Sequence, residues 1–153
     1  MEEQIHNTYI KAFKTALEED LNDEKFDWVC KLHREIVIRI CSIIPRRNDL
    51  HDQIAEKMDP IVFRQMLDNN CFKGEDFVAM VDYVYGWLYR LCAPVRDDEI
   101  KKTHEELYNS LSSLTFGQLV PMFVIGVHGH LDNIVKDLAN EQTTEMKKII
   151  QNK

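Results

Sequence analysis

The sequence predicts an all-α fold, a single compact helical bundle that spans residues 1–153 and has a central apolar helix. Apolar residues recur three and four positions apart along almost the whole chain, which is the spacing of one helix face. No run alternates apolar and polar residues between turn-forming pairs, as a strand would. The pattern indicates about seven helices, and their short connections indicate one shared core.

The first two helices are long. Residues 3–19 are predicted to form the first, after which Asn22 and Asp23 are expected to make a turn and cap the next helix. The second helix is expected to end at Pro45, because the residue before a proline is pushed away from the α region. The first helix has an apolar stripe with a spacing of four residues, made of Ile5, Tyr9, Phe13 and Leu17.

Two shorter helices follow this proline. Asn48 or Asp49 is expected to cap the first of them, because short polar side chains accept hydrogen bonds from the free N–H groups of a helix start. Asp59 followed by Pro60 predicts the start of the second, since proline is favoured at the first helical position. This second short helix is expected to cover residues 60–68.

The C-terminal half is predicted to hold the central helix and two others. The segment 75–91 is apolar on most sides, which is typical of a helix surrounded by its neighbours. Pro94 is expected to open the next helix, whose first turn is acidic. Thr115 and Gln118 have the spacing of a capping box for the last helix, and Pro121 then implies either a kink or a later start.

Composition and charge exclude several classes of function. The chain carries 26 acidic and 19 basic residues, a formal charge of −7, which disfavours binding to nucleic acid or to anionic lipid and favours a basic ligand or a protein partner. The longest mostly apolar run, residues 114–127, is shorter than the ~20 residues of a membrane span. The N-terminus resembles neither a secretory signal nor a transit peptide. We therefore expect a cytoplasmic protein.

The sequence contains no motif that is typical of catalysis, and we expect neither an enzyme nor a cofactor or metal site. His128 and His130 are two residues apart, so on a helix their rings point to nearly opposite faces. Gly126 and Gly129 indicate close helix packing. The cysteines stand alone and are expected to be reduced, mostly buried thiols. These are Cys30, Cys41, Cys71 and Cys92.

Residues 91–100 combine a helix break with a cation at the start of a helix. Arg96 lies where the helix dipole disfavours positive charge, so Glu99 or a carboxylate on another helix is expected to compensate it. We favour an internal clasp between two helices, with a ligand or partner contact as the alternative. Arginines around the turn after the second helix form either a small basic patch or a solvated turn. The candidate partner-binding residues are therefore Arg39, Arg46, Arg47, Arg96, Asp97, Asp98 and Glu99.

The same segment, LCAPVRDDEI, is similar to the Leu-Cys-Ala-Pro-x-Arg-Asp-x-Glu signature of the T-complex protein 11 family. The flanking stretches IIPRRNDLHDQIAEKMDPIVFRQMLDNNCF and LTFGQLVPMFVIGVHGHL extend the resemblance to about residues 27–138, which match the N-terminal portion of the family's chains. Arg46-Arg47 replaces a Gly-His pair of the family, and Asp98 replaces a glutamate. The resemblance implies a helical regulator with no catalytic residues, associated with cAMP-dependent kinase signalling and, in animals, sperm function.

Two hypotheses of function follow. The first is a non-enzymatic interaction and regulatory module whose acidic surface or basic turn binds another protein. The family's chains run several hundred residues, so a short version is also what a gene captured by a virus would give. The alternative is a bundle with a groove that takes an amphipathic helix or a small apolar ligand, as apoptosis-regulating bundles do, and the central helix with Tyr85, Gly86 and Trp87 motivates it. The apolar stripe of the last helix, which fades beyond Asn140, is compatible with a homodimer.

Overall fold

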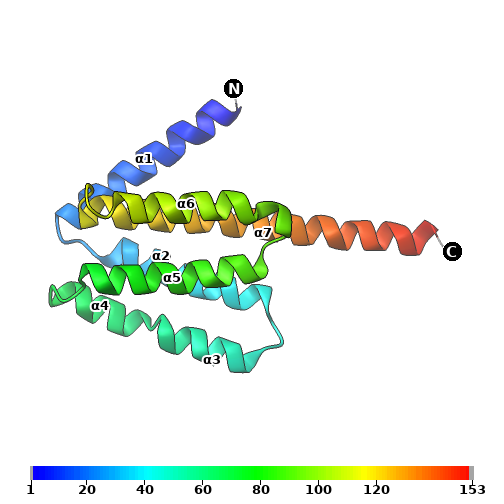
Figure 1. Cartoon of the computed structure of the whole chain (residues 1–153), viewed down its shortest axis with the longest axis horizontal. Helices are drawn as coiled ribbons and strands as arrows, with labels where there is room; N and C mark the ends of the chain where they lie inside the picture. The colour runs from blue at the N-terminus through cyan, green and yellow to red at the C-terminus, as the bar shows by residue number, and fades with distance from the viewer. Residues whose placement is uncertain (1, 152–153) are drawn as a thin grey trace.

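The computed structural model describes residues 2–151, which form seven α-helices, one short 3₁₀ helix and no strand (Figure 1). The prediction of an all-α bundle is therefore confirmed. Helices α5, α6 and the first part of α7 run beside one another, while the start of α1 and the end of α7 project from them. The elements are α1 (Glu2–Asn22), α2 (Asp27–Ile43), α3 (Asn48–Lys57), α4 (Pro60–Asp68), α5 (Gly74–Leu91), η1 (Pro94–Arg96), α6 (Asp97–Ser110) and α7 (Phe116–Gln151).

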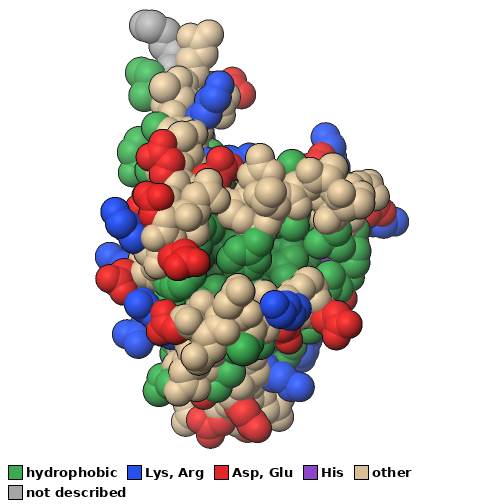
Figure 2. All heavy atoms as spheres, turned by 90° about the vertical axis from the view of Figure 1, so that its left-hand side faces the viewer, with side chains coloured by type: hydrophobic (Ala, Val, Ile, Leu, Met, Phe, Trp, Pro, Cys, Tyr) green, Lys and Arg blue, Asp and Glu red, His purple; other side chains and the backbone are tan. Residues whose placement is uncertain are grey.

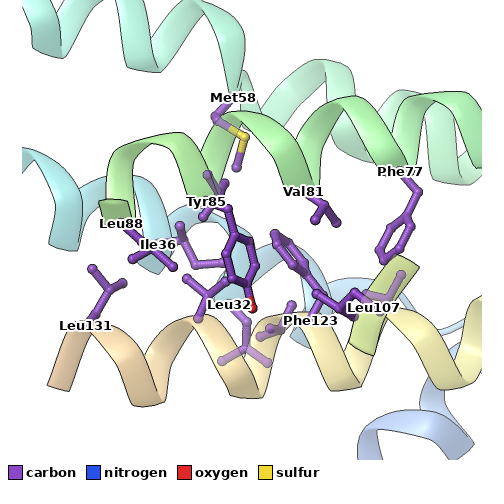
Figure 3. Packing of buried hydrophobic residues seen from close by; sticks show 14 of the residues in the cluster. Leu32, Ile36, Met58, Phe77, Val81, Tyr85, Leu88, Leu107, Phe123 and Leu131 are labelled. Atoms are coloured by element: carbon purple, nitrogen blue, oxygen red, sulfur yellow. The ribbon is translucent and has the colours of Figure 1, made fainter. Parts of the chain in front are cut away.

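The core lies around α5, the helix that the sequence predicts to be central (Figure 3). Tyr85 and Leu88 of α5 have no exposed surface, and Phe123 of α7 is almost completely buried. The rings of Phe77 and Phe123 meet edge to face, with their centroids 5.8 Å apart. Ile36 of α2 is buried in the same cluster. Removal of the apolar surface of the whole cluster from water supplies most of the driving force for folding.

Two predicted helix caps are wrong. Helix α1 continues to Asn22, and α2 begins at Asp27 after a residue whose side chain makes no capping hydrogen bond. The chain reverses here through its backbone, because Glu24 adopts a positive φ of 57° and its N–H bonds the carbonyl of Leu21 at 3.1 Å. Asn48 is the first residue of α3 and caps nothing.

The start of α4 follows the prediction. The Oδ1 atom of Asp59 accepts hydrogen bonds from the N–H groups of Ile61 at 2.9 Å and Val62 at 3.4 Å, and Pro60 takes the first helical position. Asp59 therefore satisfies two of the N–H groups that a helix start leaves free.

The start of α7 combines a correct and an incorrect prediction. The backbone N–H of Thr115 donates to Oε1 of Gln118 at 3.0 Å, as a capping box requires. Pro121 lies inside the helix, so the alternative of a later start is wrong. A proline at this position costs one hydrogen bond to the preceding turn, and the helix continues through it.

The projecting ends of α1 and α7 leave part of the apolar pattern in water. Ile5 is 69% exposed and Tyr9 is 70% exposed, so the predicted stripe of α1 is buried only at Leu17. Beyond residue 138 every described residue of α7 is exposed, which agrees with the fading of the apolar stripe beyond Asn140. A periodic stripe identifies a helix face, but it does not show whether a neighbour covers that face.

Two further expectations about small residues are wrong. A Cβ atom added at Gly129 would have no heavy atom within 4 Å, and one at Gly126 would lie 3.8 Å from the Tyr85 hydroxyl, an ordinary contact. Neither glycine therefore marks a close helix crossing. The four cysteines are free as expected, but none is fully buried, and Cys71 is exposed.

Candidate partner-binding site

A hollow lined mainly by apolar side chains lies between α4 and the N-terminal half of α5. Its volume is about 310 Å³, and the end of α3 closes one side. Three methionines contribute to it, and their flexible side chains let an apolar surface adapt to different partners. The apolar lining consists of Met58, Val62, Phe63, Met66, Phe72, Ala79, Met80 and Tyr83.

A second hollow, of about 840 Å³, adjoins the first and lies between the start of α5 and the α6–α7 connection. Both hollows are lined by Phe72 and Ala79, and we call the two together the α5 groove. Figure 2 views the end of the bundle where the α4–α5 and α6–α7 connections lie, and it shows a recessed hydrophobic surface bordered by charged side chains. The other apolar residues of the second hollow are Phe77, Val78, Leu111, Phe116 and Leu119.

The α4–α5 connection places Phe72 between the two hollows. Asn70 ends α4 in the left-handed region, with a φ of 53°, and turns the chain back toward α5. The N–H of Lys73 then donates to the Asp76 carboxylate at 2.9 Å, which fixes the start of α5. Between these two points the Phe72 ring contacts Phe63 of α4 and Phe116 of α7, with centroids 5.3 and 5.5 Å away.

His33 of α2 lines the inner side of the first hollow and is only 3% exposed. Its ring stacks on Phe63 with 4.2 Å between the centroids, and its buried Nδ1 atom has no hydrogen-bond partner among the described residues. Burial lowers the pKa of His33 to about 4, because the low-dielectric surroundings disfavour the imidazolium. At neutral pH the ring is therefore uncharged and adds to the apolar lining.

Acidic side chains outnumber basic ones around the α5 groove. The carboxylates of Asp59 and Asp76 accept hydrogen bonds from backbone N–H groups at the starts of α4 and α5, whereas Glu56 and Glu75 are exposed. The border therefore carries a local negative potential, which attracts cations before contact. The charged lining residues are Glu56, Asp59, Glu75, Asp76 and Asp82 against Lys57 and Lys73.

The structure places Arg96 in the internal clasp that the sequence favours. Its Nε and Nη2 atoms donate to the two carboxylate oxygens of Asp137 at 3.0 and 3.1 Å, and Nη1 donates to Glu99 at 3.3 Å. The pair joins η1 to α7, and the Arg96 side chain is 28% exposed. Asp97 accepts a hydrogen bond from the thiol of Cys92 at 3.1 Å. A partner contact by Arg96, Asp97, Asp98 and Glu99 stays a prediction.

Replacing Arg96 with alanine is expected to lower the urea midpoint of unfolding at pH 7, because Asp137 loses its bidentate partner. The hydrogen bonds from Arg96 lower the pKa of Asp137 below its ordinary 3.8. A carboxyl with a depressed pKa stabilises the fold above its unfolded-state pKa and loses that effect as the pH falls through the folded-state value. The difference in unfolding midpoint between the unmodified chain and Arg96→Ala should therefore become smaller below about pH 4. Arg96→Lys keeps the charge, so its urea midpoint should lie between those of the unmodified chain and Arg96→Ala. An unchanged midpoint for Arg96→Ala would exclude the clasp.

The arginines near the second helix do not form one free basic patch. Arg39 bonds α7 instead, with Nη2 2.6 Å from an oxygen of Asp132 and Nη1 3.0 Å from Nδ1 of His128. Arg47 pairs with Asp49 at the start of α3. A role of Arg39, Arg46 and Arg47 in binding a partner stays a prediction. The side chain of Arg39 is already paired with α7 inside this chain.

Buried polar groups tie α5, α6 and α7 together, which the sequence does not indicate. Thr103 of α6 lies 2.9 Å from the hydroxyl of Tyr85 and 2.7 Å from Nε2 of His130. Closer to the surface, His104 joins the Tyr89 hydroxyl to the Asp82 carboxylate, each at 3.1 Å. His128 and His130 thus serve opposite faces of α7, as predicted from their spacing.

Sequence reasoning did not find the α5 groove where it lies. The groove hypothesis was motivated by the central helix with Tyr85, Gly86 and Trp87, but the Tyr85 and Trp87 side chains are buried, and the Arg90 guanidinium covers the Trp87 ring at 4.3 Å. The open surface lies one to three turns earlier in α5. One signal was available, the short helix α4 followed directly by the Asn-rich turn, because a short helix covers only part of a longer neighbour.

Comparisons with known proteins give the family of the chain. Within residues 2–151 no helix is long and apolar enough to cross a membrane, and no three His, Cys, Asp or Glu residues are placed to hold a metal ion. No solved structure matches the chain. It is 29% identical over 107 residues to the T-complex protein 11 homolog of Homo sapiens, an alignment that covers 67% of this chain and 20% of that protein. The chain thus spans about a fifth of that relative's length. The model of the T-complex protein 11 family matches residues 1–152, wider than the resemblance in the sequence, and the chain belongs to this family.

Proposed function

We propose that the chain is a non-enzymatic interaction module that binds a protein partner through the α5 groove. The observation that supports this is the continuity of two apolar hollows through Phe72 and Ala79 on one end of the bundle. Large exposed apolar surfaces with a polar border are typical of interaction sites in water-soluble domains. This function combines the first hypothesis, protein docking, with the surface that the second hypothesis requires.

Affinity capture with matched variants tests this proposal. Ala79 is exposed and lines both hollows, so Ala79→Arg should block the groove without disturbing the core. Ala55→Arg makes the same exchange at an exposed position of α3 that lines neither hollow. We expect quantitative mass spectrometry to recover the same partner with the unmodified chain and with Ala55→Arg, and to lose it with Ala79→Arg. Partners that persist with Ala79→Arg would contradict the proposal.

The family suggests what the module regulates. We propose that it modulates cAMP-dependent kinase signalling, as the resemblance of LCAPVRDDEI to the family signature implies. Activity of the kinase holoenzyme, measured with and without added chain, tests this step separately. An unchanged activation curve would leave the interaction module in place and exclude the kinase as its target. A cytoplasmic location and a viral origin stay predictions from the sequence.

A further inference from the structure

We propose that the occupant of the α5 groove is a basic amphipathic helix of about three turns. This inference rests on the proposed function and adds the chemistry of the partner. The groove follows α5 from Phe72 to Tyr83, a stretch that matches roughly 18 Å of helix at 1.5 Å per residue. A helix of that length presents apolar anchors at positions i, i+3 or i+4, and i+7 along one face.

The shape of the groove agrees with a helix in preference to a compact ligand. Its two hollows follow the same stretch of α5 on neighbouring faces, the first from Asp76 to Tyr83 and the second from Gly74 to Asp82, and they meet at Phe72 and Ala79. Apolar surface is therefore offered along the axis of α5 over several turns. Val62 of α4 is 47% exposed at its side, although it is a large apolar residue. An apolar helix face laid along this line would cover these side chains together.

Charge decides which helix fits. Five carboxylates and two lysines line the α5 groove, and the whole chain has a formal charge of −7. Lysine or arginine residues on both borders of the partner's apolar face would meet Glu56 and Glu75, which belong to opposite hollows. Complementary potentials of this kind raise the association rate and exclude partners of the wrong sign.

The same charges disfavour the other occupants. A second copy would bring two acidic borders together, and like charges across an interface are costly. An anionic membrane surface would be repelled for the same reason. The inner side of the first hollow also carries no positive charge at neutral pH, because burial of the His33 ring, which is 3% exposed, lowers its pKa to about 4.

Fluorescence anisotropy with three labelled 18-residue peptides tests the inference. The first peptide is a designed helix of leucine and lysine with one apolar face, the second replaces each lysine with glutamate, and the third has the composition of the first in an order without an apolar face. We expect saturable binding of the first peptide only, weakened at least tenfold by Ala79→Arg and unchanged by Ala55→Arg. The double variant Glu56→Gln, Glu75→Gln should weaken binding about threefold to tenfold, since border charge pairs contribute little each, and should flatten its salt dependence.

Each other result contradicts the inference in a distinct way. Equal binding of the glutamate peptide would exclude charge selection, and equal binding of the reordered peptide would show attraction without a helix face. Self-association in sedimentation equilibrium that Ala79→Arg abolishes would identify a second copy as the occupant. If Ala79→Arg loses a cellular partner while the leucine–lysine peptide does not bind, the proposed function holds and the basic helix is wrong. Both failures together would remove the groove as a binding site.

Discussion

Tyr85→Ala is expected to destabilise the fold by about 3–5 kcal/mol, the usual cost of removing a large aromatic side chain from a core. Tyr85 has no exposed surface, and its ring stacks on His104 with 4.4 Å between the centroids. The side chain lies between α5, α6 and α7, so its loss leaves a cavity that three helices border (Figure 3). Urea unfolding followed by circular dichroism at 222 nm measures the change.

Tyr85→Phe separates the ring from its hydroxyl. The hydroxyl bonds Thr103, which keeps the carbonyl of Ile100 at 3.0 Å and the ring of His130 as partners after the exchange. We therefore expect a loss of only about 1 kcal/mol, the net worth of one hydrogen bond. Equal losses for the two variants would show that the polar network, and not the packing of the ring, makes Tyr85 important.

The fold is expected to lose about 2–3 kcal/mol of stability between pH 7.5 and pH 4.5 through His33 alone. Burial lowers the pKa of this ring from 6.5 to about 4. Below pH 6.5 the unfolded chain therefore binds a proton at His33 that the folded chain does not bind. The free energy of unfolding thus decreases as the pH is lowered, until the pH reaches the folded-state pKa of about 4. Unfolding free energies from urea titrations at several pH values test this.

His33→Phe is the matched variant for this prediction. Phenylalanine keeps the stacking surface toward Phe63 and removes the unpartnered Nδ1 atom. We expect stability at pH 7.5 to be unchanged or higher, and a shallower decline with pH. Burial also lowers the pKa values of His128 and His130, but these act equally in both proteins, so the difference isolates His33. Parallel pH profiles would show that His33 does not titrate as described.

The elements that sequence predicted best are those with a local physical cause. Asp59 and Pro60 define the start of α4 within four residues, since capping and a fixed φ act on the nearest backbone. Arg96 needed a carboxylate for an equally local reason, the positive end of a helix. Its main partner, Asp137, comes from α7, 41 residues away, and no spacing rule identifies it.

The groove and the exposed stripes depend on which helices are neighbours. Ile5 and Leu17 belong to the same predicted stripe, yet one is 69% exposed and the other fully buried. Phe72 has no periodic signal of its own, and it becomes part of the groove because α4 and α7 bring Phe63 and Phe116 to its ring. Such placements follow from the directions of whole helices.

The sequence by itself determined the helices, the central position of α5, the acidic surface and the need for a partner at Arg96. Only the tertiary structure decided where apolar surface stays open, which histidines are buried and which arginines are already paired. Helical periodicity and capping act over a few residues and can be read along the chain. Burial instead depends on the distance to segments far away in sequence. In this chain the short helix α4 covers only part of the outer surface of the first half of α5, so that the α5 groove remains.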